Sequence, residues 1–137
     1  MGYIEDALSY IKDTLSHYLS NVFEDVVLEL IPKLYEIGVV KTRPIEIGKW
    51  WYKGEEIDAV IRDPGKSTTF VEIKWRELDK EEALNTFREL EDKAARTGLM
   101  SPRNYYIIVT KKAPSDLEIN EHRVLIDLKT LNKLLSE

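Results

Sequence analysis

The chain of 137 residues has no cysteine and no glutamine, and it has two histidines, His17 and His122. The absence of cysteine excludes disulfide bonds, thiol catalysis and cysteine-based zinc sites. Because the two histidines stand far apart in the sequence, a histidine-rich metal site is not expected. A chain without glutamine and with many glutamates and lysines is typical of heat-adapted cytosolic proteins. Carboxylates and lysines are therefore the groups left for polar chemistry.

Long apolar runs are missing as well. No apolar segment approaches the roughly 18 residues of a membrane-spanning helix. The N-terminus MGYIEDALSY lacks the basic-then-apolar order of a signal peptide. We therefore expect a soluble, cytoplasmic protein without a membrane partner. The formal net charge is −5, with basic residues interspersed among acidic ones, which counts against tight nonspecific DNA binding but allows a small metal-assisted site.

The first part of the chain has helical patterning. Apolar residues recur at helical spacing over about the first 37 residues. Asn21, with Glu24 three residues later, has the pattern of a capping box that would start a second helix. Pro32 predicts a kink or an early end of that helix. Since the length suits one domain, we interpret residues 1–137 as a single unit, with an N-terminal helix over 1–20 as a connector and a core over 21–137.

Three strands, a helix and a further strand are predicted next. The strand predictions depend on β-branched and aromatic residues, and the helix over 79–96 on a capping box at Asp79 and Glu82 with Gly98 at its end. The predicted strands are 44–52, 56–61, 68–75, 104–110 and a short one at 123–126, before a final helix capped by Asp127. This order, with a right-handed β-α-β crossover, predicts an α/β domain with a mixed central sheet flanked by helices.

Asp58, Glu72 and Lys74 are the candidate catalytic residues. They lie in two predicted strands joined by the turn at Pro64-Gly65. If the hairpin folds symmetrically about Gly65, Asp58 faces Glu72, and side-chain alternation puts Lys74 on the same face. A slip of one residue in the pairing would instead separate the two carboxylates onto opposite faces.

Two neighbouring carboxylates need a compensating cation. They repel by roughly 3 kcal/mol at an effective dielectric constant near 20. Lys74 offers one positive charge, and a divalent ion offers two. Mg²⁺ binds one or two carboxylates and keeps several waters, so it can activate a water while a lysine stabilises charge beside it. Glu24, next to the apolar stripe of its helix, is the candidate third metal-binding carboxylate.

Structural explanations compete with each assignment. A plain set of ion pairs among Asp58, Glu72 and Lys74 fits the residue types equally well. In the same hairpin register Glu56 faces Lys74 and would hold it in a salt bridge. For Glu24, the capping box with Asn21 is a full structural explanation. The basic residues of the helix over 79–96 are assigned to its solvated face: Lys80, Arg88, Lys93 and Arg96.

These residues and their order resemble the PD-(D/E)XK nuclease superfamily. EEIDAV (55–60) supplies Asp58, VEIKW (71–75) supplies Glu72 and Lys74, and VFEDVV (22–27) supplies Glu24. The resemblance implies a restriction-endonuclease-like α-β-β-β-α-β core that hydrolyses DNA phosphodiester bonds. It also implies that Asp58, Glu72 and Glu24 bind Mg²⁺ or Mn²⁺ and that Lys74 assists catalysis. The literal Pro-Asp is missing because Ile57 precedes Asp58, a frequent departure in this superfamily.

A narrower resemblance covers roughly residues 20–110. FEDVV, GKWWYKGEEIDAV and FVEIKWREL are similar to the C-terminal nuclease-like domain attached to archaeal AAA-type ATPases. It implies an ATPase domain or subunit and DNA, including branched DNA, as partners, and it allows a homodimer. The chain has no GxxxxGK[ST] loop, so we expect no ATP binding by this segment. A catalytically inactive module of the same fold, docking to nucleic acid or to a partner, is the alternative hypothesis.

Overall fold

The structure is a computed structural model that describes residues 2–115 and 120–136. This part of the chain forms three helices and five strands: α1 (Gly2–Glu36), β1 (Glu46–Tyr52), β2 (Glu55–Asp63), β3 (Ser67–Glu77), α2 (Lys80–Thr97), β4 (Arg103–Lys112), β5 (Arg123–Asp127) and α3 (Leu128–Leu135). The five predicted strands are all present. Their ends differ from the prediction by no more than two residues.

The strands form one mixed sheet in the order β1-β2-β3-β4-β5. β1 with β2 and β2 with β3 pair antiparallel, whereas β3 with β4 and β4 with β5 pair parallel. Helix α2 makes the connection between the parallel neighbours β3 and β4. The prediction of an α/β domain with a mixed sheet is therefore confirmed.

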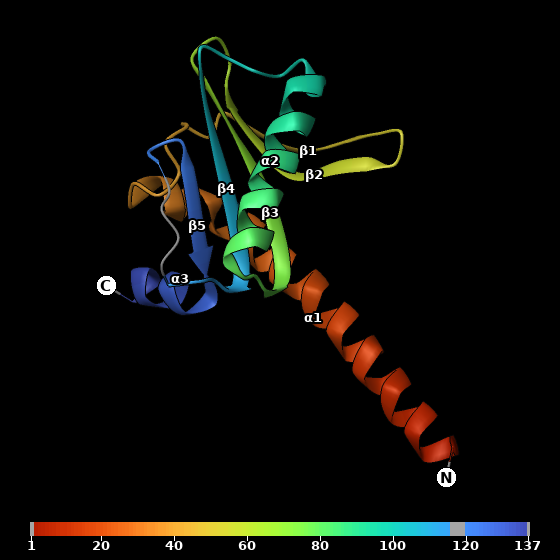
Figure 1. Ribbon diagram of the computed structural model, residues 1–137. Coiled ribbons are helices and arrows are strands. Elements are labelled where there is room, and N and C mark those ends of the chain that lie inside the picture. Colours follow the sequence, from red (N-terminus) through yellow and green to blue (C-terminus); the bar gives the residue numbers. More distant parts are fainter. Residues whose placement is uncertain (1, 116–119, 137) are drawn as a thin grey trace.

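Helices cover both faces of this sheet (Figure 1). The second half of α1 and α3 pack on one face, where Val27 and Leu131 join Ala59 and Ile107 in one buried cluster. Helix α2 covers the other face through Phe87 and its buried neighbours. Because β2, β3, β4 and β5 contribute to both clusters, the sheet is the middle layer of three.

Helix α1 is continuous, which corrects the prediction of a new helix at Asn21. Within the described chain Asn21 caps no helix; its amide nitrogen lies 3.5 Å from Nε2 of His17, one turn earlier. Pro32 lies inside the helix rather than at its end. From Phe23 onward one face of α1 is buried against the sheet. This tertiary packing keeps the helix continuous past the cap pattern at Asn21 and past Pro32.

The first part of α1 projects away from the body of the molecule (Figure 1). Its apolar side chains are largely exposed; Ile11, for example, is 51% exposed. None of the described helices is both long enough and apolar enough to cross a membrane. The buried face of α1 therefore belongs to its second half, which also carries Glu24.

The two other helices start and end where the sequence predicts. Asp79 and Glu82 form a reciprocal capping box at the start of α2, and Gly98 ends it with φ 72°. That left-handed conformation is one that glycine adopts without steric cost. Asp127 caps α3 by accepting a hydrogen bond from Thr130 N. These local signals fix where α2 and α3 begin and where α2 ends.

Candidate active site

The β2–β3 hairpin has the predicted register, but only along part of its length. The paired residues run from Asp63 and Ser67 next to the turn to Ala59 and Val71, symmetric about the turn as predicted. The ladder ends there, so the expected backbone pairs of Asp58 with Glu72 and of Glu56 with Lys74 do not form. The two strands separate at this point.

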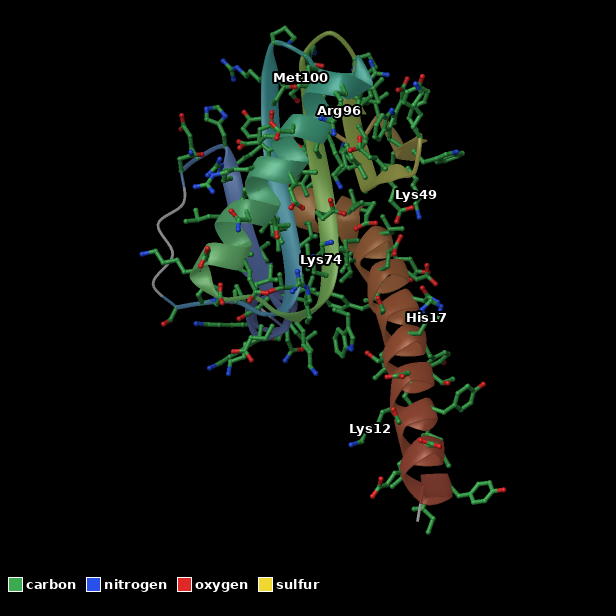
Figure 2. The ribbon with its side chains drawn as sticks, turned by 45° about the vertical axis from the view of Figure 1, so that its right-hand side comes forward. Lys12, His17, Lys49, Lys74, Arg96 and Met100 are labelled. Atoms are coloured by element: carbon green, nitrogen blue, oxygen red, sulfur yellow. The ribbon has the colours of Figure 1, made fainter. Side chains whose placement is uncertain are left out.

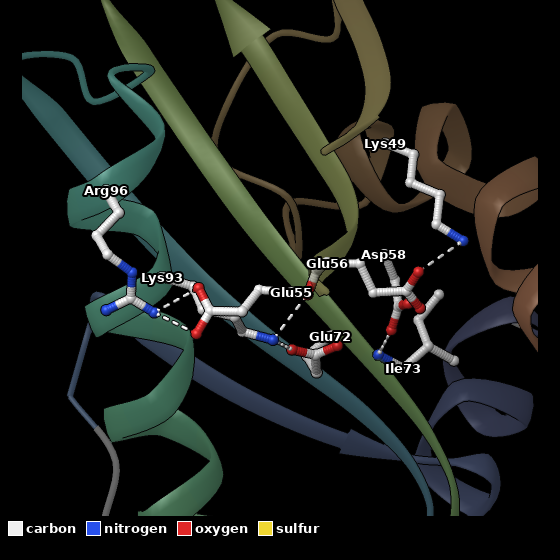
Figure 3. Close-up of polar contacts among 8 residues, drawn as sticks. All are labelled: Lys49, Glu55, Glu56, Asp58, Glu72, Ile73, Lys93 and Arg96. Carbon is white, nitrogen blue, oxygen red and sulfur yellow. Dashed lines mark hydrogen bonds and ion pairs between the residues drawn. The ribbon is translucent and has the colours of Figure 1, made fainter. Parts of the chain in front are cut away.

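Beyond the end of the ladder, the side chain of Asp58 on β2 accepts a hydrogen bond from the backbone of β3. Its Oδ2 accepts a hydrogen bond of 2.7 Å from Ile73 N (Figure 3). On its other side, β2 contains a bulge: Gly48 pairs with Val60 and Trp50 with Ile57, so two residues of β2 oppose one of β1. A bulge bends its strand and can re-aim a side chain. Asp58 is thus held by the backbone of β3 at a distorted point of β2.

A cleft of ≈ 870 Å³ opens beside this point, between α1, the ends of β2 and β3, and α2. All four predicted site residues, Asp58, Glu72, Lys74 and Glu24, line it. Figure 2 shows Lys74 on β3, on the side of the molecule where α1 passes the sheet. The structure therefore brings the predicted residues to one place, although they come from three elements.

The two central carboxylates are buried. Asp58 is 6% exposed and Glu72 is 5% exposed. Burial above all, with the nearby charge of Asp58, raises the pKa of Glu72 to about 7 against the lowering effect of Lys93. Glu72 therefore titrates near neutral pH, which is typical of functional sites.

Lys93 is the partner of Glu72, and the sequence reasoning missed it. Its Nζ lies 2.7 Å from Glu72 Oε2 and 2.8 Å from the Glu56 carbonyl oxygen (Figure 3). The assignment of Lys93 to a solvated helix face is therefore wrong. Its position next to Ala94, in the buried stripe of α2, was the available signal. One turn later Arg96 pairs with Glu55 at 2.8 Å.

Lys49 holds the remaining acids of this region. Its Nζ lies 3.7 Å from Glu24 Oε1 and 3.5 Å from Glu56 Oε2. The expected salt bridge between Glu56 and Lys74 is therefore wrong, because Glu56 turns toward the edge strand β1. Burial, and then the charge of Asp58, raise the pKa of Glu24, while Lys49 lowers it. The pKa of Glu24 is thus affected by the charge of Asp58, while Lys49 is the cation that pairs with Glu24.

Lys74 is half-buried in the cleft wall. Within the described residues its ammonium makes no hydrogen bond or ion pair. The alternative in which Lys74 neutralises Asp58 and Glu72 is not what the structure shows, since Lys93 neutralises Glu72. The Lys74 ammonium is thus available to a ligand in the cleft.

The donor set fits a metal ion that binds few protein ligands. In the parts of the chain that the structure describes, no three Asp, Glu, His or Cys side chains are gathered to hold a metal. Asp58 and Glu72 form a buried pair, and Mg²⁺ is commonly held by one or two carboxylates with water filling its other positions. The residues therefore fit such an ion at Asp58 and Glu72, whereas Glu24 is not gathered with them into a site of three carboxylates in the described part of the chain.

Comparison with known proteins places this chain in a family. Residues 1–86 match the model of DUF234, described as archaeal and bacterial proteins of unknown function. The chain belongs to DUF234. The matched residues include α1, Asp58, Glu72 and Lys74, whereas Lys93 on α2 follows them.

A longer relative shows how much of a related protein such a segment occupies. The chain is 36% identical over 120 residues to an uncharacterized protein of Methanocaldococcus jannaschii, covering 87% of this chain. It spans only 27% of that relative's length. No solved structure matches the chain.

Proposed function

We propose that this chain is a metal-dependent nuclease-like domain that hydrolyses DNA phosphodiester bonds. The observation that carries the proposal is the buried pair Asp58 and Glu72, placed where β2 and β3 separate at a large cleft. The element order supports a restriction-endonuclease-like core, and so does Lys74, whose ammonium has no partner among the described residues. Mg²⁺ or Mn²⁺ is the cofactor that suits two carboxylates.

Each residue has a distinct role in this proposal. Asp58 and Glu72 would hold the ion, and Ile73 N–H keeps Asp58 oriented through one oxygen. The bound ion would supply Lewis-acid stabilisation and a water of lowered pKa. Lys74 would bind a phosphate oxygen and stabilise the negative charge that develops there. Glu24, paired with Lys49, would orient water at the α1 side of the cleft.

Lys93 gives the pair of carboxylates a counter-ion when no metal is bound. Its ammonium contacts Glu72 where solvent has limited access, since 18% of the Lys93 side chain is exposed. A divalent ion at Glu72 would exchange with this ammonium. Once displaced, Lys93 would be a second cation in the same cleft, beside the phosphate.

The test is cleavage of labelled single-stranded, duplex and branched DNA with Mn²⁺ and, separately, with EDTA. We expect cleavage only with Mn²⁺, and a loss of at least about a hundredfold in Asp58→Asn. Asparagine still accepts the Ile73 hydrogen bond, so the fold is preserved. Asp92→Asn, in the same cleft wall, is the matched control and should retain activity.

A non-catalytic module is the second candidate function. The Glu72–Lys93 ion pair favours it, because this pair already satisfies the buried charge without a metal. The related archaeal protein is much longer than this chain and has room for further domains. An ATPase domain as partner therefore stays part of the proposal. Titration calorimetry and the cleavage assay together separate the two functions. Absence of both Mn²⁺ binding and DNA cleavage would establish the non-catalytic module.

A further inference from the structure

A cluster of basic residues lies at the other end of the hairpin, by the β2–β3 turn. Lys41 and Arg43 follow α1, Lys66 lies in the turn, and Arg103 begins β4. These four residues, which we call the basic pocket, line one cavity of ≈ 490 Å³ together with Tyr35 and Tyr105. Three separate segments of the chain build it.

The basic pocket has uncompensated charge. Its four cationic side chains are exposed, and within the described residues none of them forms an ion pair or a side-chain hydrogen bond. Among the described residues that line the cavity, Asp63 is the one acidic residue. The active-site cleft, by contrast, is lined by seven carboxylates. In a chain of net charge −5, this pocket therefore offers an anionic ligand a local excess of positive charge.

The size and the aromatic residues of the pocket suggest which anion it takes. Its volume falls within the roughly 300–1,000 Å³ of ligand sites. Tyr35 is 38% exposed, so it offers a ring on which a base can stack. We propose that the basic pocket binds the phosphate backbone of a single-stranded nucleic acid.

The sheet relates this pocket to the cleft. Asp58 and Asp63 lie five residues apart on β2, which is roughly 16 Å of strand. A strand stacked at the 3.4 Å rise of duplex DNA covers that distance in about five nucleotides, and a more extended single strand covers it in fewer. The inference rests on the proposed function only in that the same strand would continue to the cleft; binding by the pocket needs no catalysis.

The experiment measures the anisotropy of a fluorescein-labelled 12-nucleotide single strand in EDTA. Lys41→Glu with Arg103→Glu is compared with Lys129→Glu with Lys133→Glu, an equal change of charge on the exposed side of α3. We expect the first variant to bind at least about tenfold more weakly and to lower the salt slope by about 1.4, or 0.7 per lost phosphate contact. The α3 variant should bind within about threefold of wild type.

Three results would overturn the inference. They are absence of wild-type binding, equal weakening in both double variants, and a matched duplex that binds as tightly as the single strand. Because EDTA removes any cleavage, the outcome is independent of the proposed function. A wild-type protein that binds through the pocket but does not cleave DNA with Mn²⁺ would contradict the proposed function and would still support the inference about the pocket.

Discussion

At the scale of single residues, the structure is decided by how each buried charge is neutralised. Glu72 is buried beside Asp58, so both carboxylates could not ionise without a nearby cation. Lys93 supplies that cation from α2, and Lys49 does the same for Glu24 from β1. The carboxylates of the candidate site are thus matched by lysines that have no place in the sequence motif.

Replacing Lys93 tests whether its ammonium competes with a metal. We expect Lys93→Met to tighten Mn²⁺ binding at least about tenfold, equivalent to about 1.4 kcal/mol, because Glu72 loses its internal partner. The same change should lower the stability of the metal-free protein. Titration calorimetry gives the affinity. Arg96→Met, which removes a cation paired with Glu55 instead, is the control and should leave affinity unchanged; weaker binding by Lys93→Met would contradict the exchange.

The raised pKa of Glu72 predicts a pH dependence of stability. Its pKa is about 7 in the folded protein, against roughly 4.3 when unfolded. The folded state therefore holds this proton more tightly than the unfolded state does. The stability contributed by the bound proton is lost as pH rises from about 4.3 through about 7. We expect Glu72→Gln to remove that part of the slope in urea unfolding in EDTA between pH 5 and 8. The exposed Glu89→Gln should keep the wild-type slope.

At the scale of elements, α1 combines two different environments in one helix. Its second half contributes Phe23, Val27 and Ile31 to the core, whereas its first half lies outside the body. Both halves have apolar residues at helical spacing, so the pattern alone predicts helix without telling which turns are buried. The contacts with β3 decide this, because they fix the part of α1 that covers the sheet.

Two alanine substitutions in α1 test that division. We expect Ile31→Ala, at a position 1% exposed, to lower the free energy of unfolding by about 2–5 kcal/mol, since it leaves a cavity in the core. Ile11→Ala should change it by no more than about 0.5 kcal/mol, because that side chain is exposed. Urea unfolding monitored by tryptophan fluorescence measures both. Comparable losses at the two positions would show that the first half is packed.

At the scale of the whole molecule, one sheet joins the two hydrophobic clusters and the site. Neighbouring residues such as Val71 and Phe70 on β3 enter opposite clusters. Asp58 and Glu72 belong to the same two strands. We therefore expect the body to unfold in one cooperative transition, with ion binding coupled to that transition.

This coupling gives a direct measurement of metal binding. At a free Mn²⁺ concentration about 100 times the dissociation constant, the unfolding free energy should rise by about 2.7 kcal/mol. Asp58→Asn should abolish most of this gain, because one of the two proposed ligands loses its charge. Urea unfolding with and without Mn²⁺ measures it. An equal gain in Asp58→Asn would place the bound ion elsewhere.

The sequence by itself determined the features that depend on neighbours along the chain. The Pro64-Gly65 turn set the β2–β3 register, and Asp79 and Gly98 set the ends of α2. Because these are local signals, the element order and the positions of Asp58 and Glu72 followed from them. The exception was Asn21, whose local cap signal lost to the packing of α1 on the sheet.

Only the tertiary structure decided the features that join distant segments. It ended the hairpin ladder before Asp58, paired Glu72 with Lys93, and gathered Lys41, Lys66 and Arg103 into one pocket. Charge attraction and burial act across space, so residues far apart in the chain become partners only once the sheet and its helices are packed.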